Sequence, residues 1–132
     1  DGGLLISLTG GNRVPGIPAH RDEDILLFQP AQLGDATAGS WSPFFIGAKV
    51  GLREQGESVA AADFDPATGQ LTLAGPAGTQ MGDLTGAAAD LLLCQLAGMG
   101  DATDCDPPPT FLWRGGDFGF GGEDIDALAI GW

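Results

Sequence analysis

Two segments of this chain, 66 residues apart, carry nearly the same sequence. Residues 24–37 (DILLFQPAQLGDAT) and residues 90–103 (DLLLCQLAGMGDAT) are identical at nine of 14 positions. Random pairing at ordinary residue frequencies gives about one identity over this length. The chain is therefore predicted to be a duplication, and a duplicated unit that cannot bury its apolar face alone has to pack copy against copy.

The flanking residues extend the match over nearly all of the 132-residue chain. Apolar residues and glycines recur at almost the same spacing, with small slips. The recurring pairs are Leu8 and Leu73, Gly10 and Gly75, Gly16 and Gly82, Phe44 and Phe111, Gly47 and Gly115, Gly51 and Gly119, and residues 57–61 and 123–127. We predict repeat 1 in residues 1–66 and repeat 2 in residues 67–132, which together form one structural unit.

Each repeat is expected to form four strands, because it contains four short apolar runs bounded by Gly, Pro or Asp. The predicted strands are Leu4–Leu8, Asp24–Phe28, Pro43–Gly47 and Val59–Phe64 in repeat 1, and Gln70–Ala74, Asp90–Cys94, Thr110–Arg114 and Ile125–Ile130 in repeat 2. Residues 65–69 (DPATG) predict a turn, since Pro presets φ and Gly tolerates positive φ. A helix over Leu84–Ala97 is an alternative, which Pro18 in the equivalent segment of repeat 1 disfavours.

The predicted fold class is all-β, with two four-stranded repeats of about 66 residues arranged as propeller-blade-like meanders. A pseudo-twofold β-sandwich or barrel is the alternative. Two blades cannot close a ring, so this arrangement leaves strand edges exposed unless several chains assemble or the two sheets fold onto each other.

The charge is strongly negative, with 18 acidic residues against five Lys and Arg and a net charge of −13. Such a surface cannot neutralise phosphates and does not dock on anionic lipid, so we expect no nucleic-acid partner. No apolar run is long enough for membrane insertion. Cations or basic surfaces are the partners that this charge favours.

Cys94 and Cys105 are 11 residues apart and lie outside any Cys-x-x-Cys motif. With a single histidine in the chain, zinc has too few soft ligands. We predict a disulfide between them, which implies an oxidising compartment; two unpaired thiols are the alternative.

Short motifs resemble a tandem β-repeat module of bacterial extracellular and cell-surface proteins. The pattern consists of an acidic strand start, Leu-Gly, Thr-x-Gly-x-Trp, an aromatic strand that runs into Val-Gly-Leu, and Glu-Asp-Ile-Asp-Ala. In this chain the motifs fall at residues 22–28, 33–34, 37–41, 44–52 and 123–127. The resemblance implies a secreted or surface location and association with sister repeats. The family pattern has Asp before Val-Gly-Leu, where this chain has Lys49.

Acidic clusters predict a calcium site at the strand ends. They comprise Asp22, Glu23 and Asp24 before one predicted strand and Asp117, Glu123, Asp124 and Asp126 around the last turn. Ca²⁺ takes six to eight oxygen ligands from carboxylates and carbonyls, which acidic Gly-rich loops supply. Solvated acids at strand ends are the simpler interpretation, because no stretch matches an EF-hand or a calcium-binding nonapeptide repeat.

Three tryptophans, Trp41, Trp113 and Trp132, are candidates for contact with a ligand or partner. Trp41 and Trp113 lie beside apolar strands, which favours core packing for both. Trp132 is predicted to dock on a neighbouring chain.

We expect a non-enzymatic extracellular module that self-associates or packs with sister repeats, of fibre or surface-layer type, with Ca²⁺ as a candidate stabilising ion. A carbohydrate-binding module that uses exposed Trp and acidic residues is the alternative. A small glycoside-hydrolase-like enzyme is a more distant alternative, because no pair of acids stands out as catalytic.

Overall fold

The computed structural model describes residues 2–9, 14–17, 19–53 and 56–131, and these ranges form short strands joined by turns and single-turn 3-10 helices. The strands are β1 (Leu4–Ser7), β2 (Ile25–Gln32), β3 (Ala38–Phe45), β4 (Ala61–Asp65), β5 (Gln70–Ala74), β6 (Gln80–Met81), β7 (Leu84–Thr85), β8 (Asp90–Gly98), β9 (Asp104–Cys105) and β10 (Thr110–Arg114). The 3-10 helices are η1 (Gly47–Val50), η2 (Gly100–Ala102) and η3 (Gly115–Phe118).

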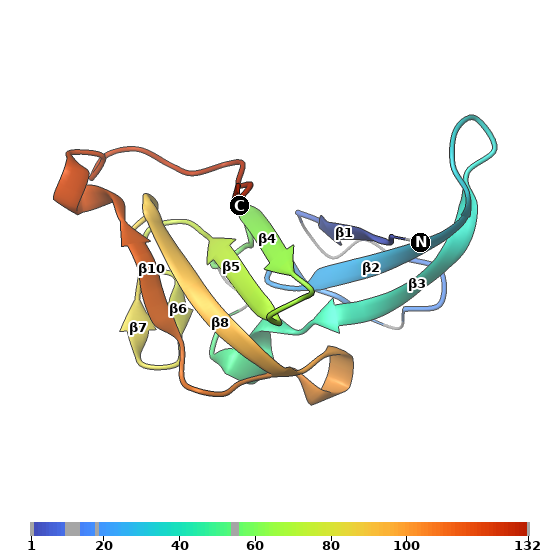
Figure 1. Ribbon diagram of the computed structural model, residues 1–132, viewed down its shortest axis with the longest axis horizontal. Helices are drawn as coiled ribbons and strands as arrows, with labels where there is room; N and C mark the ends of the chain where they lie inside the picture. The colour runs from blue at the N-terminus through green and yellow to red at the C-terminus, as the bar shows by residue number, and fades with distance from the viewer. Residues whose placement is uncertain (1, 10–13, 18, 54–55, 132) are drawn as a thin grey trace.

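Two antiparallel sheets make up most of the molecule (Figure 1). The first has the strand order β1-β2-β3. The second has the order β10-β8-β5-β4, with β9 also paired to β8, and β6 and β7 form a small separate ladder. The all-β prediction is confirmed, and the sheets do not close into a barrel.

The strand predictions agree best in the second sheet. The bounds of β5 and β10 are as predicted, and β2, β3 and β8 run further than predicted. The alternative helix over residues 84–97 is wrong, because this range holds β7 and most of β8 with a turn between them. The predicted strand Ile125–Ile130 was wrong: residues 123–131 have no strand assignment. A strand needs a neighbouring strand for its backbone groups. Ile125 donates a backbone hydrogen bond to Ala88, but in the described chain this segment pairs with no strand.

The two sheets have three and five strands, whereas four strands were predicted for each repeat. One reason is that β4, from the first half of the chain, pairs with β5 in the second sheet. The connection is the predicted turn. The Asp65 carboxylate accepts hydrogen bonds from the Ala67 N–H (2.8 Å) and the Thr68 hydroxyl (2.7 Å), and these bonds lower the pKa of Asp65. Gly69 closes the turn at a φ of 74°, a conformation that favours glycine.

The two halves of the chain share one local topology. In the first half β1, β2 and β3 are neighbours in one sheet and η1 follows β3. In the second half β5, β8 and β10 are neighbours in the other sheet and η3 follows β10, with β6, β7, η2 and β9 inserted between them along the chain. The β2–β3 ladder skips Phe44 and the β8–β10 ladder skips Leu112, so the same bulge recurs. The structure thus aligns Phe44 with Leu112, one residue later than the sequence comparison did.

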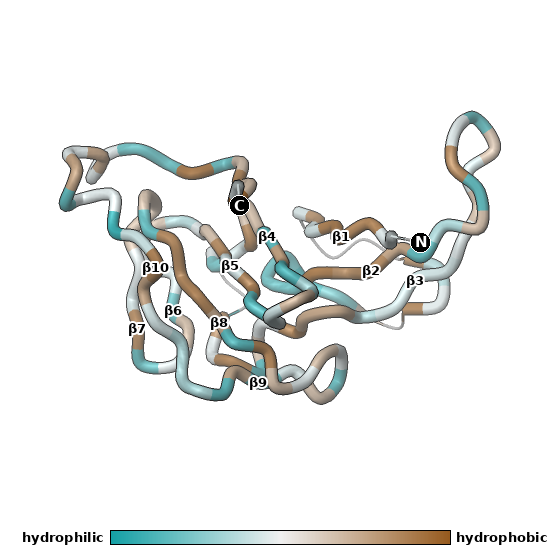
Figure 2. The backbone as a smooth tube through the Cα atoms, viewed as in Figure 1, coloured by the Kyte–Doolittle hydropathy of each residue, from teal (hydrophilic) through white to brown (hydrophobic). Residues whose placement is uncertain are grey.

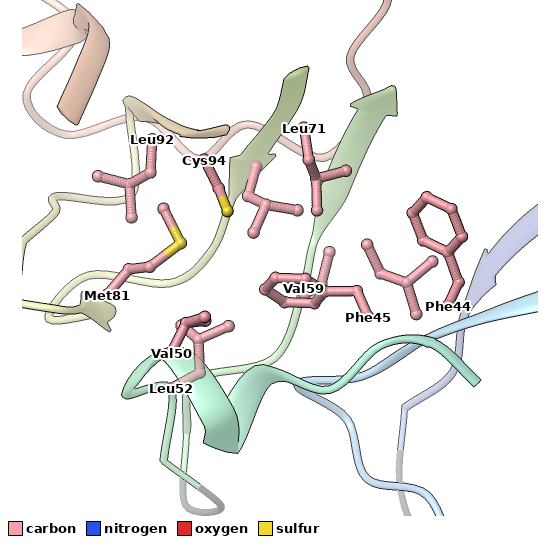
Figure 3. Packing of buried hydrophobic residues seen from close by; sticks show 11 residues of the cluster. Phe44, Phe45, Val50, Leu52, Val59, Leu71, Met81, Leu92 and Cys94 are labelled. Atoms are coloured by element: carbon pink, nitrogen blue, oxygen red, sulfur yellow. The ribbon is translucent and has the colours of Figure 1, made fainter. Parts of the chain in front are cut away.

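One hydrophobic core joins the two sheets (Figures 2 and 3). Its buried members lie on both halves of the chain: Ile25, Phe44, Phe45, Val50, Leu52, Val59, Leu71, Leu73, Met81, Leu92 and Cys94. Figure 3 shows Phe45 and Val50 directed from the first half toward Leu71 and Met81 of the second. The two halves are therefore stabilised by burying apolar surface against each other.

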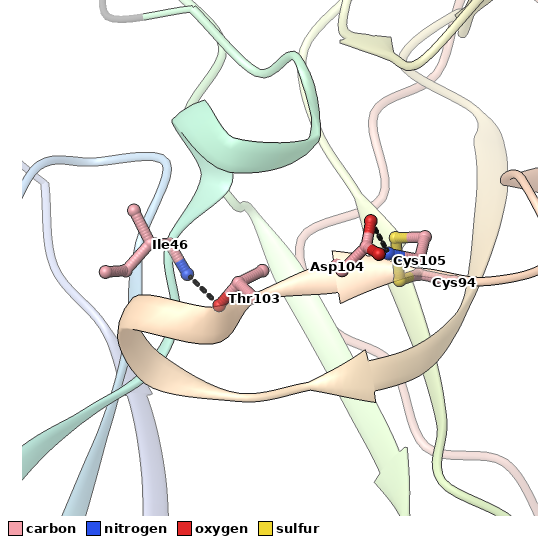
Figure 4. The surroundings of a disulfide bond; sticks show 5 residues. All are labelled: Ile46, Cys94, Thr103, Asp104 and Cys105. Carbon is pink, nitrogen blue, oxygen red and sulfur yellow. Dashed lines mark hydrogen bonds between the residues drawn. A yellow bond between two sulfur atoms is a disulfide. The ribbon is translucent and has the colours of Figure 1, made fainter.

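Cys94 and Cys105 form the predicted disulfide, with a Cα–Cα distance of 5.3 Å (Figure 4). The bond joins β8 to β9, and the Cys94 side chain lies in the core. It holds the loop of η2 in place beside Ile46, whose N–H donates to the Thr103 hydroxyl at 3.0 Å.

Candidate functional site

The Asp24 side chain, a predicted calcium ligand, is buried and bonded to the backbone. Its carboxylate accepts hydrogen bonds from the N–H groups of Arg21 (2.9 Å) and Gly47 (3.0 Å). Asp90 repeats the arrangement with Ala87 (2.9 Å) and Gly115 (3.1 Å). Both carboxylates therefore anchor a turn to the end of a neighbouring strand.

Glu23 is the most unusual acid of the chain, because it is fully buried and neither of its carboxylate oxygens has a hydrogen-bond partner among the described residues. Burial raises the pKa of Glu23, and the neighbouring Asp22 and Asp24 raise it further. Asp22 itself is half-buried, and its carbonyl oxygen accepts a hydrogen bond from Val59 at 2.9 Å. A carboxyl group in this environment favours the protonated form, which is a poor ligand for a cation.

The second acidic cluster lies on the surface near the C-terminal end of the described chain. Asp117 belongs to η3, and Glu123, Asp124 and Asp126 follow it, all exposed. Within the described ranges, no group of three or more His, Cys, Asp or Glu side chains is close enough to hold a metal ion. Calcium binding therefore stays a prediction.

The tryptophans differ in their surroundings. Trp41 is half-buried, lies 4.7 Å from the Phe28 ring and packs against the small cluster of Val14, Ile17 and Leu26. Trp132 lies outside the described residues.

Trp113 is part of a surface aromatic group. Its ring stacks on Phe118 at 5.6 Å with an interplanar angle of 13° and lies 5.9 Å from Phe120. Phe118 and Phe120 are well exposed, and the sequence analysis did not single them out. The signal that points to them is structural: they occupy the positions of Val50 and Leu52 in the first half.

His20 lines a cavity together with Arg21, Asp24 and Asp101. It is buried, and neither ring nitrogen has a hydrogen-bond partner among the described residues. The described residues that line this cavity include no Ser, Thr or Cys, so the cavity brings no hydroxyl or thiol nucleophile to the histidine.

The β1 edge is the first of two exposed apolar features. β1 pairs with β2 on one side only, and its Leu4 is 45% exposed. The corresponding strand β5 pairs on both sides, and its Leu71 is fully buried. An edge strand with apolar side chains and free backbone groups is a template for another strand.

The second exposed apolar feature is the surface formed by β10 and the residues that follow it. Leu112, Phe118 and Phe120 are exposed, whereas their counterparts Phe44, Val50 and Leu52 are buried in the core. Residues 124–131 continue from this end in an extended course without a strand partner.

The start of that extended segment has a counterpart in the first half. Ile125 donates a backbone hydrogen bond to Ala88 (3.1 Å), just as Val59 donates to Asp22 (2.9 Å). After Val59 the chain enters β4 and pairs with β5. The residues after Ile125 form no ladder, although residues 126–128 line a pocket beside β1.

No protein-family model matches the chain, and neither a curated protein nor a solved structure does. None of the helices in the described ranges is long and apolar enough to cross a membrane.

Proposed function

We propose that this chain is a non-enzymatic structural module, secreted or displayed on a cell surface, that associates with itself or with sister repeats. The observation that carries the proposal is the pair of exposed apolar ends. The β1 edge and the surface of Leu112, Phe118 and Phe120 are exposed, yet the equivalent positions in the other half are buried. Exposed apolar patches of this kind mark interaction sites in soluble proteins.

The proposal is supported by the way in which the two halves already associate. The first half supplies β4 to the sheet of the second half, so one repeat completes the sheet of the next. Strand addition to a free edge is a common mode of protein association, because main-chain hydrogen bonds supply affinity while side-chain packing supplies specificity. The disulfide fits an oxidising location.

Multi-angle light scattering over a range of chain concentrations, with and without millimolar Ca²⁺, tests the proposal. We expect the mean mass to rise with concentration and filaments or oligomers to be visible by electron microscopy. A constant monomer mass up to millimolar concentration would refute self-association.

Polysaccharide binding is the second candidate function, favoured by the stacked rings of Trp113 and Phe118. Exposed aromatic faces can stack on sugar rings because both surfaces are flat and partly apolar. Retention on polysaccharide columns that is lost in Trp113→Ala would support it. Trp41→Ala is the matched control, because Trp41 already packs on Phe28.

A further inference from the structure

The contact between the two halves uses different surfaces on each half. The first half contributes Phe44, Val50 and Leu52, and the second half contributes residues of β5, β6 and β8. The hydrogen bonds that cross the contact include Gly82 N–H to the Val50 carbonyl (2.7 Å) and Ile46 N–H to the Thr103 hydroxyl (3.0 Å).

In the described chain η3 does not make the reciprocal of the contact that η1 makes. A Cβ placed on Gly51 would lie 3.2 Å from the Gly82 nitrogen, whereas one placed on Gly119 or Gly16, their counterparts, would meet nothing within 4 Å. A twofold arrangement would make both contacts alike. The interface is therefore heterologous, so each pair of halves leaves one donor surface and one acceptor surface unused.

We infer that the unused donor surface binds the unused acceptor surface of a second copy of this chain, head to tail. This inference rests on the proposed function and specifies its geometry. The donor surface comprises Leu112, Phe118, Phe120 and residues 127–131, and the acceptor surface is β1. Residues 127–131 of one chain pair antiparallel with β1 of the next.

The β4–β5 ladder fixes the register of this pairing. In that ladder Ala61 faces Ala74 and Asp63 faces Thr72. Val59 corresponds to Ile125 through its hydrogen bond, and β1 corresponds to β5 because Leu4 faces Phe28 as Leu71 faces Cys94. The equivalent pairs between chains are Ala127 with Ser7, Leu128 with Ile6, Ala129 with Leu5, and Ile130 with Leu4.

This pairing covers the exposed apolar side chains at both ends. Phe64 of β4 lies 5.0 Å from the Phe44 ring, so Ile130 is placed over Leu112 in the same way. Leu4 and Leu5 would become as buried as Leu71 and Thr72 are in β5. A heterologous contact propagates from copy to copy and gives a ring if the rotation between copies closes or a filament if it does not.

Closure of the same segment on its own β1 is the competing outcome. Asp126, Ala127 and Leu128 line a shallow pocket together with Leu5 and Ser7 of the same chain. Two variants that each carry one added cysteine distinguish pairing between chains from closure within one chain. Each variant carries only one of the two cysteines that would have to meet, so a bond between the added cysteines can form only between two chains.

In the experiment, Ala129→Cys and Leu5→Cys are purified separately, given different mass tags, mixed and allowed to oxidise. The native disulfide stays intact, and both positions are on the surface or at its edge, so folding is preserved. Ala129→Cys mixed with Ala67→Cys is the matched control, since Ala67 is exposed and lies in the turn between β4 and β5, which belong to the other sheet.

We expect the first mixture to form a disulfide-linked heterodimer. Its yield should be at least tenfold higher than the yield of heterodimer in the control mixture. Equal yields in the two mixtures, or a Leu5→Cys/Ala129→Cys double variant that closes only within one chain, would overturn the inference. If light scattering still shows assembly in that case, the proposed function survives and only the head-to-tail register fails.

Discussion

The Asp24 carboxylate accepts a hydrogen bond from the backbone N–H of Gly47 at 3.0 Å, and Asp90 accepts the same bond from Gly115 at 3.1 Å. In both places the bond joins the start of one strand to the 3-10 helix that follows its neighbour. A Cβ on Gly47 would lie 2.4 Å from the Glu23 carbonyl oxygen, and one on Gly115 would lie 2.4 Å from that of Ala89, so both sites require glycine. Each half thus fixes the direction in which its chain leaves the sheet.

Replacing either aspartate by asparagine is expected to destabilise the fold by a similar amount. Asn keeps one acceptor oxygen but turns an NH₂ group toward a buried backbone N–H, which costs about 1–3 kcal/mol for an unsatisfied buried group. Urea unfolding of Asp24→Asn and Asp90→Asn measures the loss. The exposed Asp35→Asn is the control and should be neutral. A neutral effect at Asp24 or Asp90 would contradict the anchoring role.

Stability is expected to fall as pH rises above about 4.3, where an ordinary glutamate ionises. The raised pKa of Glu23 means that the folded state holds its proton when the unfolded state has lost it, and the free energy of unfolding then decreases with pH. Glu23→Ala should flatten this dependence, because it removes the titrating carboxyl group. The buried Ala89 at the same position in the second half indicates that alanine fits there. Thermal unfolding from pH 4 to pH 8 tests this, with the exposed Glu123→Ala as control. An unchanged slope in Glu23→Ala would refute it.

Reduction of the Cys94–Cys105 disulfide is expected to lower the free energy of unfolding by about 2–3 kcal/mol on the loop-entropy model. The closed loop includes η2, which contacts the end of β3. Urea unfolding with and without a phosphine reductant measures the difference. An equal midpoint in both conditions would show that the loop is held by its other contacts.

Association should strengthen with ionic strength, because two copies that each carry a net charge of −13 repel one another. Salt at 0.1 M shortens the screening length to about 10 Å. We expect the mean mass from light scattering to rise between 20 mM and 200 mM NaCl. CaCl₂ at matched ionic strength separates calcium binding from screening: a melting temperature that Ca²⁺ leaves unchanged would remove the predicted ion.

The sequence predicted those parts of the fold that depend on local pattern. The strand bounds of β5, the turn after Asp65 and the disulfide follow from alternation, turn chemistry and cysteine count. Ile125–Ile130 carries the same pattern as β4 but forms no strand, because pairing depends on a partner that local sequence does not specify. Likewise, a contiguous acidic run indicated Asp24 as a metal ligand, although its oxygens accept hydrogen bonds from the backbone N–H groups of Arg21 and Gly47.

The candidate interaction surface was less predictable than the fold. Phe118 and Phe120 became recognisable only when the bulges at Phe44 and Leu112 aligned the two halves. Their exposure is a property of packing, since the same positions in the first half are buried. The internal match predicted that the copies pack against each other, but it did not predict that their contact has a direction.

Hydrogen–deuterium exchange of the full chain at increasing concentration tests the head-to-tail contact most directly. The account predicts that backbone amides in residues 4–7 and 127–131 become protected together as concentration rises, while those of β5 and β8 stay protected throughout. Exchange at both segments that stays fast at every concentration, while light scattering records assembly, would contradict it.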